Sequence, residues 1–134
     1  MRSRLGAQAL SFASTANDIR FVRGAYERPG PATAWVRLTV PVVAGEEATG
    51  VQRALGAADF GNGFSAVLDW DRWAFINPDL TVYLERDPVG EWIALEAQTL
   101  LQPDGTGVAE SVLFDQTGRF GRAVQALLIQ PRDS

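Results

Sequence analysis

Cysteine, histidine and lysine are all absent from this sequence of 134 residues, and its twelve basic residues are all arginine. These absences exclude Ser-His-Asp and Cys-His nucleophiles, Schiff-base lysines, the P-loop lysine and zinc sites built on His or Cys. No acidic cluster of the Asp-x-Asp-x-Asp kind predicts a metal–carboxylate site, so we expect neither a metal nor a cofactor. Any catalysis must therefore use carboxylates, amides, hydroxyls, arginine or backbone groups.

Long apolar runs and positive charge are also scarce. The net charge is −4, and the arginines are scattered from Arg2 to Arg132, so the basic face that nucleic-acid binding needs is not predicted. No apolar stretch approaches the roughly 20 residues that span a bilayer, and residues 1–5 lead into no signal-peptide core. We therefore expect a cytoplasmic protein that binds neither nucleic acid nor membrane. Arginine without lysine is also typical of a GC-rich bacterial genome.

The composition that is present fits one folded domain. Hydrophobic residues make up 46% of the chain and charged residues 21%, as in ordinary globular proteins. We expect residues 1–17 to form an N-terminal arm or one helical turn, residues 18–130 a single domain, and residues 131–134 a C-terminal tail.

The pattern of apolar residues predicts one helix among many strands. The helix is expected over residues 46–58, with Glu46 and Glu47 in the first turn, where acidic groups favour the helix dipole. A turn is expected over residues 27–32, which contain Pro-Gly-Pro. Alternating apolar residues predict strands over 18–26, 34–40, 64–68, 73–76, 80–86, 91–101, 108–114 and 120–130. Four helix residues follow the i, i+3, i+4, i+7 spacing of a buried face: Val51, Ala54, Leu55 and Ala58.

This order of elements predicts an α+β fold. Two strands, one helix and then several antiparallel strands with short turns indicate a hotdog fold, an antiparallel sheet wrapped around one long helix. An antiparallel barrel or a nuclear-transport-factor-like cone is the main alternative, although such cones usually begin with helices.

Three polar residues stand where a β-rich sequence rarely places them. Asp59 ends the helical run and opens a Gly-rich loop, Asn77 stands between Ile76 and Pro78, and Gln125 interrupts an apolar strand. A buried amide or carboxylate without a partner costs a few kcal/mol, about 1–3 in proteins, so each needs a reason. If the three side chains converge, they form a hydrogen-bonded cluster that can hold a water against a substrate.

Four segments carry a resemblance to a known family. They are Ala57-Ala58-Asp59-Phe60-Gly61-Asn62-Gly63, residues 75–82 (Phe-Ile-Asn-Pro-Asp-Leu-Thr-Val), residues 86–92 (Arg-Asp-Pro-Val-Gly-Glu-Trp) and residues 121–125 (Gly-Arg-Ala-Val-Gln). In this order they resemble the C-terminal half of type II acyl-CoA thioesterases, which are double-hotdog proteins. The resemblance runs from about Ala34 to Gln130.

The resemblance implies a catalytic site and a substrate. In that family an aspartate at the end of the hotdog helix works with a Thr, Ser or Asn and with a Gln on the last strand. These roles fall on Asp59, Asn77 and Gln125, and they imply hydrolysis of fatty acyl-CoA to free acid and CoA. Because the family usually carries two hotdog halves in one chain, we expect this single half to form a homodimer or higher oligomer.

Simpler interpretations stay open for each residue. Asp59 could simply end its helix, Asn77 could shape a turn, and Gln125 could face solvent on the exposed side of a sheet.

The function of the whole protein also has alternatives. The protein could be a non-catalytic acyl-CoA-binding or structural hotdog that lacks its partner half, whereas a hotdog dehydratase is disfavoured because such sites generally use histidine. Acidic residues beside turns, including Asp79, are expected to be structural. Three arginines are candidates for contact with CoA phosphates, although solvated surface positions are the default: Arg86, Arg119 and Arg122.

Overall fold

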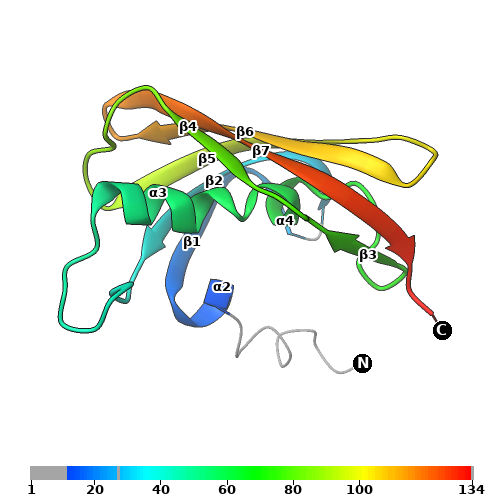
Figure 1. The fold of residues 1–134 in the computed structure, drawn as a ribbon, viewed down its shortest axis with the longest axis horizontal. Coiled ribbons are helices and arrows are strands. Elements are labelled where there is room, and N and C mark those ends of the chain that lie inside the picture. The colour runs from blue at the N-terminus through cyan, green and yellow to red at the C-terminus, as the bar shows by residue number, and fades with distance from the viewer. Residues whose placement is uncertain (1–11, 27, 134) are drawn as a thin grey trace.

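A computed structural model describes residues 12–26 and 28–133, and its centre is a seven-stranded antiparallel sheet (Figure 1). The strand order is β1-β2-β5-β6-β7-β3, and β4 also pairs with β7. Residues 1–11 of the expected arm lie outside the described residues. The strands are β1 (Asn17–Ala25), β2 (Arg28–Leu38), β3 (Trp73–Ile76), β4 (Thr81–Leu84), β5 (Trp92–Leu101), β6 (Thr106–Asp115) and β7 (Gly118–Pro131), and the helices are α2 (Phe12–Thr15), α3 (Gly50–Ala58) and α4 (Gly61–Ser65).

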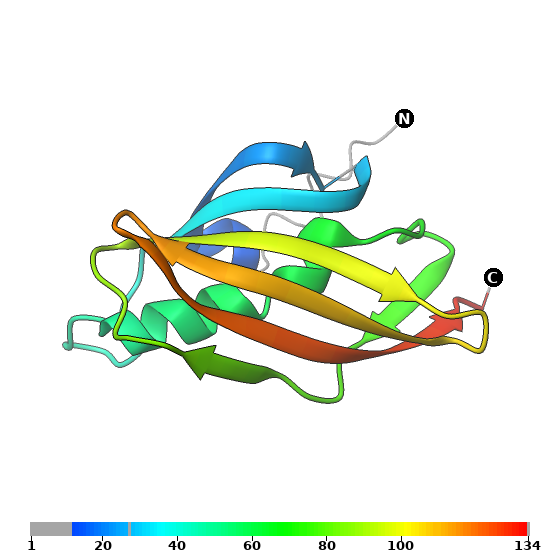
Figure 2. The same cartoon turned by 90° about the horizontal axis from the view of Figure 1, so that it is seen from above.

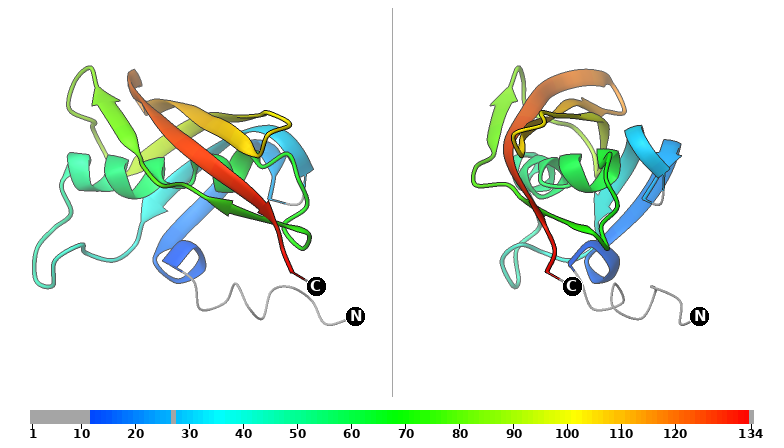
Figure 3. Two further views of the ribbon diagram at one scale, coloured as in Figure 1. Left: turned by 45° about the vertical axis from the view of Figure 1, so that its right-hand side comes forward. Right: turned by 90° about the vertical axis from the view of Figure 1, so that its right-hand side faces the viewer.

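The sheet curls around the helices. Viewed from above, β5, β6 and β7 lie over α3 and α4, and the end-on view shows the strands bending around α3 (Figures 2 and 3). β7 has 14 residues and is long enough to pair with β6 along one side and with both β3 and β4 along the other. The predicted α+β fold with a sheet wrapped around a helix is confirmed.

α3 is shorter than predicted, and it buries a different face. Thr49 caps its N-terminus in a reciprocal capping box with Gln52, so Glu46 and Glu47 precede the helix and do not lie in its first turn. The buried residues are Ala54, Ala57 and Ala58, whereas Val51 is 37% exposed and Leu55 46% exposed. The prediction that Val51 and Leu55 are buried is therefore wrong. Small alanine side chains let the helix pack close to the large residues of the sheet.

The predicted strand over residues 64–68 is also wrong, because its first residues belong to α4. Two residues separate this short helix from α3, and Phe64 and Ser65 in it are buried. The Ser65 hydroxyl donates to the carbonyl of Gly61 one turn earlier at 2.7 Å, which satisfies both groups within the helix. Local helical hydrogen bonds therefore override the short apolar pattern of this segment.

The predicted turn over residues 27–32 is largely strand, since β2 already begins at Arg28. Pro29 and Pro31 are tolerated there because pairing with β1 is irregular at this point and pairing with β5 begins only at Ala32. The predicted strand over residues 34–40 forms the second part of β2, which ends at Leu38, and the remaining predicted strands occur with shifts of at most two residues at their ends. On β5 the predicted alternation is confirmed, with Ile93, Leu95, Ala97 and Thr99 buried.

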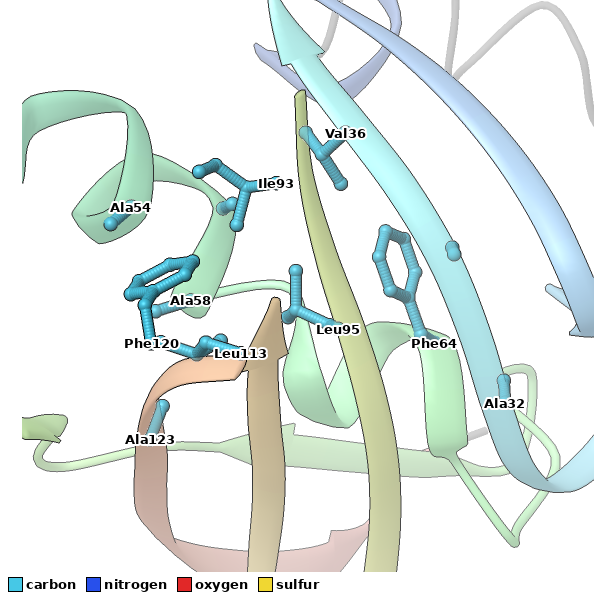
Figure 4. Packing of buried hydrophobic residues seen from close by; sticks show 12 residues of the cluster. Ala32, Val36, Ala54, Ala58, Phe64, Ile93, Leu95, Leu113, Phe120 and Ala123 are labelled. Atoms are coloured by element: carbon cyan, nitrogen blue, oxygen red, sulfur yellow. The ribbon is translucent and has the colours of Figure 1, made fainter. Parts of the chain in front are cut away.

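The core lies between the helices and the concave face of the sheet. Figure 4 shows Phe120 and Leu113 beneath the alanines of α3, and Phe64 of α4 beside Leu95 and Val36 of the sheet. Phe64 also contacts the Phe21 ring edge to face, at a centroid distance of 5.2 Å. This packing fixes the positions of both helices relative to β7, and therefore fixes the junction between α3 and α4.

Candidate active site

Asp59 lies at that junction, directly after the last residue of α3. It is the C-cap residue, and the backbone N–H of the next residue, Phe60, donates to the carbonyl of Ala57 at 3.1 Å. α4 starts at Gly61, so the chain turns between two helices at Asp59 and Phe60. The side chain of Asp59 is exposed, although the two residues before it, Ala57 and Ala58, are buried. The carboxylate is therefore held at the surface by a backbone that is fixed in the core.

Gln125 approaches the same carboxylate from β7. Its side chain is on the concave face and only 2% exposed, so the interpretation that it faces solvent is wrong. Gln125 Nε2 donates to Asp59 Oδ1 at 3.1 Å and to the Asp59 carbonyl at 3.3 Å. Its Oε1 accepts from the backbone N–H of Asn62 at 3.3 Å. The bond from Asn62 fixes which end of the amide faces Asp59.

Asn77 completes the cluster from the segment between β3 and β4. Its side chain is exposed, and Asn77 Nδ2 donates to Asp59 Oδ1 at 3.2 Å. The three residues singled out in the sequence therefore meet at one oxygen atom, from a helix end, a strand and a loop. Their catalytic role is not tested by this geometry and stays a prediction.

Some hydrogen-bonding positions of the cluster have no partner within it. Asp59 Oδ1 accepts from both amides, which leaves Oδ2 available to accept a proton from a water. Asn77 Nδ2 carries a second hydrogen, which can be donated to an oxygen that gains negative charge, whereas Gln125 Nε2 already donates to two oxygens of Asp59. An exposed carboxylate flanked by two oriented donors can thus bind a water and a carbonyl oxygen side by side.

A buried chain of polar groups extends from the cluster beneath α4. Thr99 of β5 donates its hydroxyl to Asn62 Oδ1 at 3.4 Å, and the hydroxyls of Ser65 and Thr99 are 2.8 Å apart. Within the described residues, no buried side-chain nitrogen or oxygen lacks a partner. Sequence reasoning missed all three of these residues. The only signal was Asn62 between two glycines next to Asp59.

Gly61 allows α4 to approach β6 and β7 closely at this point. A Cβ added to Gly61 would lie 2.8 Å from Ser111 Oγ and 3.4 Å from Gln125 Oε1. The first distance is shorter than real Cβ contacts allow, so a side chain here would require Ser111 or α4 to shift. Glycine at this position therefore favours the close approach of α4 to the sheet next to the cluster.

Arg86 is engaged in an ion pair at the far end of the sheet. Its guanidinium donates to both carboxylate oxygens of Asp115, at 2.6 and 2.9 Å. This bidentate contact, with further bonds from Thr117 and the Val89 N–H, holds the pKa of Asp115 well below its usual range despite burial. Arg86 is therefore part of a structural network and is not a free surface cation.

The other two candidate arginines also have partners. Arg119 pairs with Glu85 at 2.9 Å, and the Arg122 guanidinium lies 5.3 Å from the centre of the Tyr83 ring. Both lie on the surface, and nothing in the structure assigns CoA contact to them.

Neither of two sizeable surface hollows contains the cluster. One, of about 550 Å³, lies between the end of β2 and the start of α3, and the other, of about 560 Å³, lies over the outer face of the sheet. Asp59, Asn77 and Gln125 line neither of them. Among residues 12–26 and 28–133, no three acidic side chains are grouped so that they could hold a metal ion. No helix in the same part of the chain has both the length and the apolar character needed to cross a bilayer.

A comparison with models of known protein families identifies the family of this chain. The family model for the acyl-CoA thioesterase C-terminal domain matches residues 3–129. The chain belongs to this family. The resemblance to the C-terminal half of type II acyl-CoA thioesterases is thereby confirmed, and membership supports a thioesterase activity in general. No relative was found among the curated proteins.

Solved structures of other thioesterases have the same fold as this family member. A mutant thioesterase of Pseudomonas aeruginosa is 15% identical, with a TM-score of 0.64, 98% of this chain covered and 97% of that one. A hypothetical thioesterase protein of Streptococcus pneumoniae, solved with coenzyme A, is 11% identical, with a TM-score of 0.61 and coverages of 87% and 89%. These likenesses identify the sheet and its helix as a hotdog fold.

One neighbour differs in length. The acyl-CoA thioesterase II of Mycobacterium marinum is 14% identical, with a TM-score of 0.63, and the match covers 88% of this family member but 50% of that chain. The present chain thus spans about half the length of that enzyme.

Proposed function

We propose that this protein hydrolyses fatty acyl-CoA thioesters to free acid and CoA, with Asp59, Asn77 and Gln125 as its catalytic residues. The observation that carries the proposal is the meeting of both carboxamides at Asp59 Oδ1, at 3.2 and 3.1 Å. A capping aspartate needs no amides from two other elements. A carboxylate that must hold and deprotonate a water is served by such neighbours, because they fix its orientation.

The reaction needs no covalent enzyme intermediate. Asp59 Oδ2 accepts one proton of a bound water while the water oxygen attacks the thioester carbonyl. The carbonyl oxygen gains negative charge, and the second hydrogen of the Asn77 amide stabilises it, while the Gln125 amide holds Asp59 in place. The C–S bond then breaks, the thiolate of CoA leaves with the electron pair, and the proton held by Asp59 passes to the sulfur. Water and thioester become acid and thiol, and Asp59 is regenerated.

An apolar stripe beside Asp59 supports a fatty acyl substrate. Val51 and Leu55 precede Asp59 at intervals of four residues, so the three lie along one side of α3. Both apolar side chains are substantially exposed. Exposed apolar residues that lead to a polar cluster are suited to an acyl chain whose thioester carbonyl reaches the carboxylate. The coenzyme A bound to the Streptococcus pneumoniae protein, which has the same fold, is consistent with a CoA leaving group.

We further propose that two copies of the chain pair to form the working enzyme. Asp59 and Asn77 are exposed, so in a single copy no protein surface covers the site and shields the acyl chain from water. Of the two sheet edges, β1 is interrupted by two register shifts, whereas β4 pairs regularly with β7 and carries exposed Tyr83 and Leu84. An unprotected, partly apolar edge is the better surface for pairing with a second copy.

Sedimentation tests the pairing. The wild-type protein should sediment as a dimer or a higher oligomer at micromolar concentration, and Leu84→Lys should shift it toward monomer because a charge on the edge opposes strand pairing. Leu100→Lys is the matched control, since Leu100 is also exposed but lies on the interior strand β5. A wild-type protein that is only monomeric would contradict the pairing.

Turnover separates hydrolysis from the alternative, a non-catalytic hotdog that binds acyl-CoA. A panel of acyl-CoA chain lengths, assayed by release of free thiol, should show hydrolysis by the wild-type protein. Asp59→Asn should lower kcat by about 10²- to 10⁴-fold, the usual contribution of a general base. Asp104→Asn in the β5–β6 hairpin is the control and should retain activity. A folded wild-type protein that binds acyl-CoA in calorimetry without turnover would favour the binding protein and overturn the proposal.

A further inference from the structure

The segment that carries Asn77 leaves the sheet next to the cluster. β3 pairs with β7 up to Ile76 opposite Leu128, and β4 begins with Thr81 opposite Val124. Residues 77–80 are therefore four residues opposite the three residues 125–127 of β7. An extra residue of this kind bends a strand and redirects a side chain, as β-bulges do. The excursion is what allows Asn77 to reach Asp59.

One side chain replaces the strand pairing that this excursion removes. Asp79 Oδ1 accepts from the backbone N–H of Ala126 at 2.8 Å. Ala126 lies in the part of β7 that faces residues 77–80, and the peptide that carries its N–H also carries the carbonyl of Gln125. The carboxylate of Asp79 thus joins the Asn77 segment to the backbone of the other amide residue, Gln125. The sequence interpretation of Asp79 as a turn residue did not include this contact.

We propose that Asp79 is a positioning residue, whose carboxylate holds the 77–80 segment against β7 beside Gln125 and thereby keeps Asn77 in contact with Asp59. This inference rests on the proposed function of the same cluster. The hydrogen bond of the Asp79 side chain goes to the Ala126 N–H and not to Asp59, so we expect its effect on the carboxylate to pass chiefly through Asn77. Pro78 stiffens the segment between the two residues, so a displacement of Asp79 is transmitted to Asn77.

The kinetic test compares replacements that do and do not retain the acceptor. Asp79→Ala should lower kcat by about 10- to 100-fold with little change in KM, because displacement of a catalytic group by ~1 Å has an effect of this order. Asp79→Asn should recover most of the activity, since its carboxamide oxygen can accept from the Ala126 N–H. Asp104→Ala, which removes a similar carboxylate-to-backbone bond in the β5–β6 hairpin, is the control and should change kcat by less than about twofold.

A double-mutant cycle identifies the route of the effect. In an Asn77→Ala background, Asp79→Ala should have almost no further effect on kcat, because the residue that it positions is already gone. Equal losses in both backgrounds would overturn the proposal, as would an Asp79→Ala variant with unchanged kcat. If Asp79→Ala does not fold, Asp79→Glu replaces it. The longer side chain should displace the segment and lower kcat by about tenfold, and an unchanged kcat would again overturn the proposal.

A readout independent of turnover separates this inference from the proposed function. In ¹⁵N–¹H spectra, the Asn77 side-chain amide signal should shift on Asp59→Asn substitution, because the two side chains are in contact. In an Asp79→Ala background the same substitution should leave that signal unmoved. A shift of equal size in both backgrounds would overturn the positioning role even in an active enzyme. Absence of turnover in the wild-type protein would overturn only the hydrolase.

Discussion

Gln125 Nε2 lies 3.1 Å from Asp59 Oδ1, and the two residues are 66 positions apart in the chain. The same nitrogen also donates to the Asp59 carbonyl at 3.3 Å. One amide group therefore binds both the side chain and the backbone at the end of α3. This double contact joins the interior of β7 to the helix end and fixes where the carboxylate points.

Exchange of Gln125 for glutamate tests this contact with almost no change in shape. Gln125→Glu keeps an oxygen for the Asn62 N–H but removes the donor to Asp59 and places two carboxylates side by side. The two carboxylates repel each other, so Asp59 is no longer held in the orientation in which it can act as a base. We expect kcat to fall by about 10²- to 10³-fold, within the usual contribution of a general base.

The control for this exchange is Glu110→Gln on the outer face of β6, which should leave the rate unchanged. A Gln125→Glu variant with the wild-type kcat would contradict a catalytic role for the Gln125 amide.

A second prediction concerns the close approach at Gly61. Gly61→Ala should lower both thermal stability and kcat, because the added methyl group meets Ser111 Oγ at 2.8 Å and presses on Gln125. Gly63→Ala is the matched control in the same helix, since its added Cβ meets nothing within 4 Å. It should raise the unfolding free energy by about 0.5–1 kcal/mol through better helix propensity. Ser111→Ala should restore part of what Gly61→Ala loses, and the absence of any rescue would argue against this contact.

A third prediction concerns the exposed apolar stripe. Leu55→Ser should lower kcat/KM for long-chain acyl-CoA by about tenfold and leave short chains nearly unaffected, because contact with about two methylenes is lost at ~0.8 kcal/mol each. Val22→Ser, at an exposed position on the edge strand β1, is the control. Steady-state kinetics over a chain-length series checks the difference. Equal losses for short and long chains would mean that the stripe does not bind the acyl chain.

A fourth prediction concerns acid stability. The pKa of Asp115 is lowered in the folded protein, chiefly by Arg86, so its contribution to stability is complete above the unfolded value of 3.8 and is lost as the pH falls below it. The wild-type melting temperature should therefore fall steeply below about pH 4. Asp115→Asn should lower the melting temperature at pH 7 by more than about 5 °C and flatten the dependence at low pH.

Asp133→Asn is the control for acid stability and should leave the curve unchanged, since Asp133 is exposed near the C-terminus. Melting curves from pH 7 to pH 2 distinguish the two variants. An acid transition of the same steepness in Asp115→Asn would place its cause in other carboxylates.

The fold was largely predictable because the strands carry a regular alternation. On β5, every second residue from Ile93 to Thr99 is buried, and this pattern was visible in the sequence. The helix was predictable in type but not in its buried face. The periodicity of α3 fits two overlapping apolar faces, and only the tertiary packing selects the face with Ala54, Ala57 and Ala58.

The cluster itself was predictable because its members violate local patterns. A glutamine in an apolar strand requires a hydrogen-bonding partner. The resemblance of the surrounding segment to a family motif indicated that this partner is Asp59. The supporting groups were not predictable in this way. Asn62, Ser65 and Thr99 have ordinary positions in the sequence, and their hydrogen bonds depend on the contact between α4 and β5. Asp79 was expected to be a structural residue beside a turn, but its bond to Ala126 arises only where the strand pairing is interrupted.

The length of β7 has a consequence for how the site assembles during folding. Because β7 pairs with β6, β3 and β4 together, an intermediate that has not docked β7 lacks Gln125 and also has no anchor for the loop between β3 and β4. The helix end alone would then present a solitary carboxylate. The cluster therefore forms only once β7 has paired with its neighbours, and variants that slow this pairing should refold without activity until it is complete.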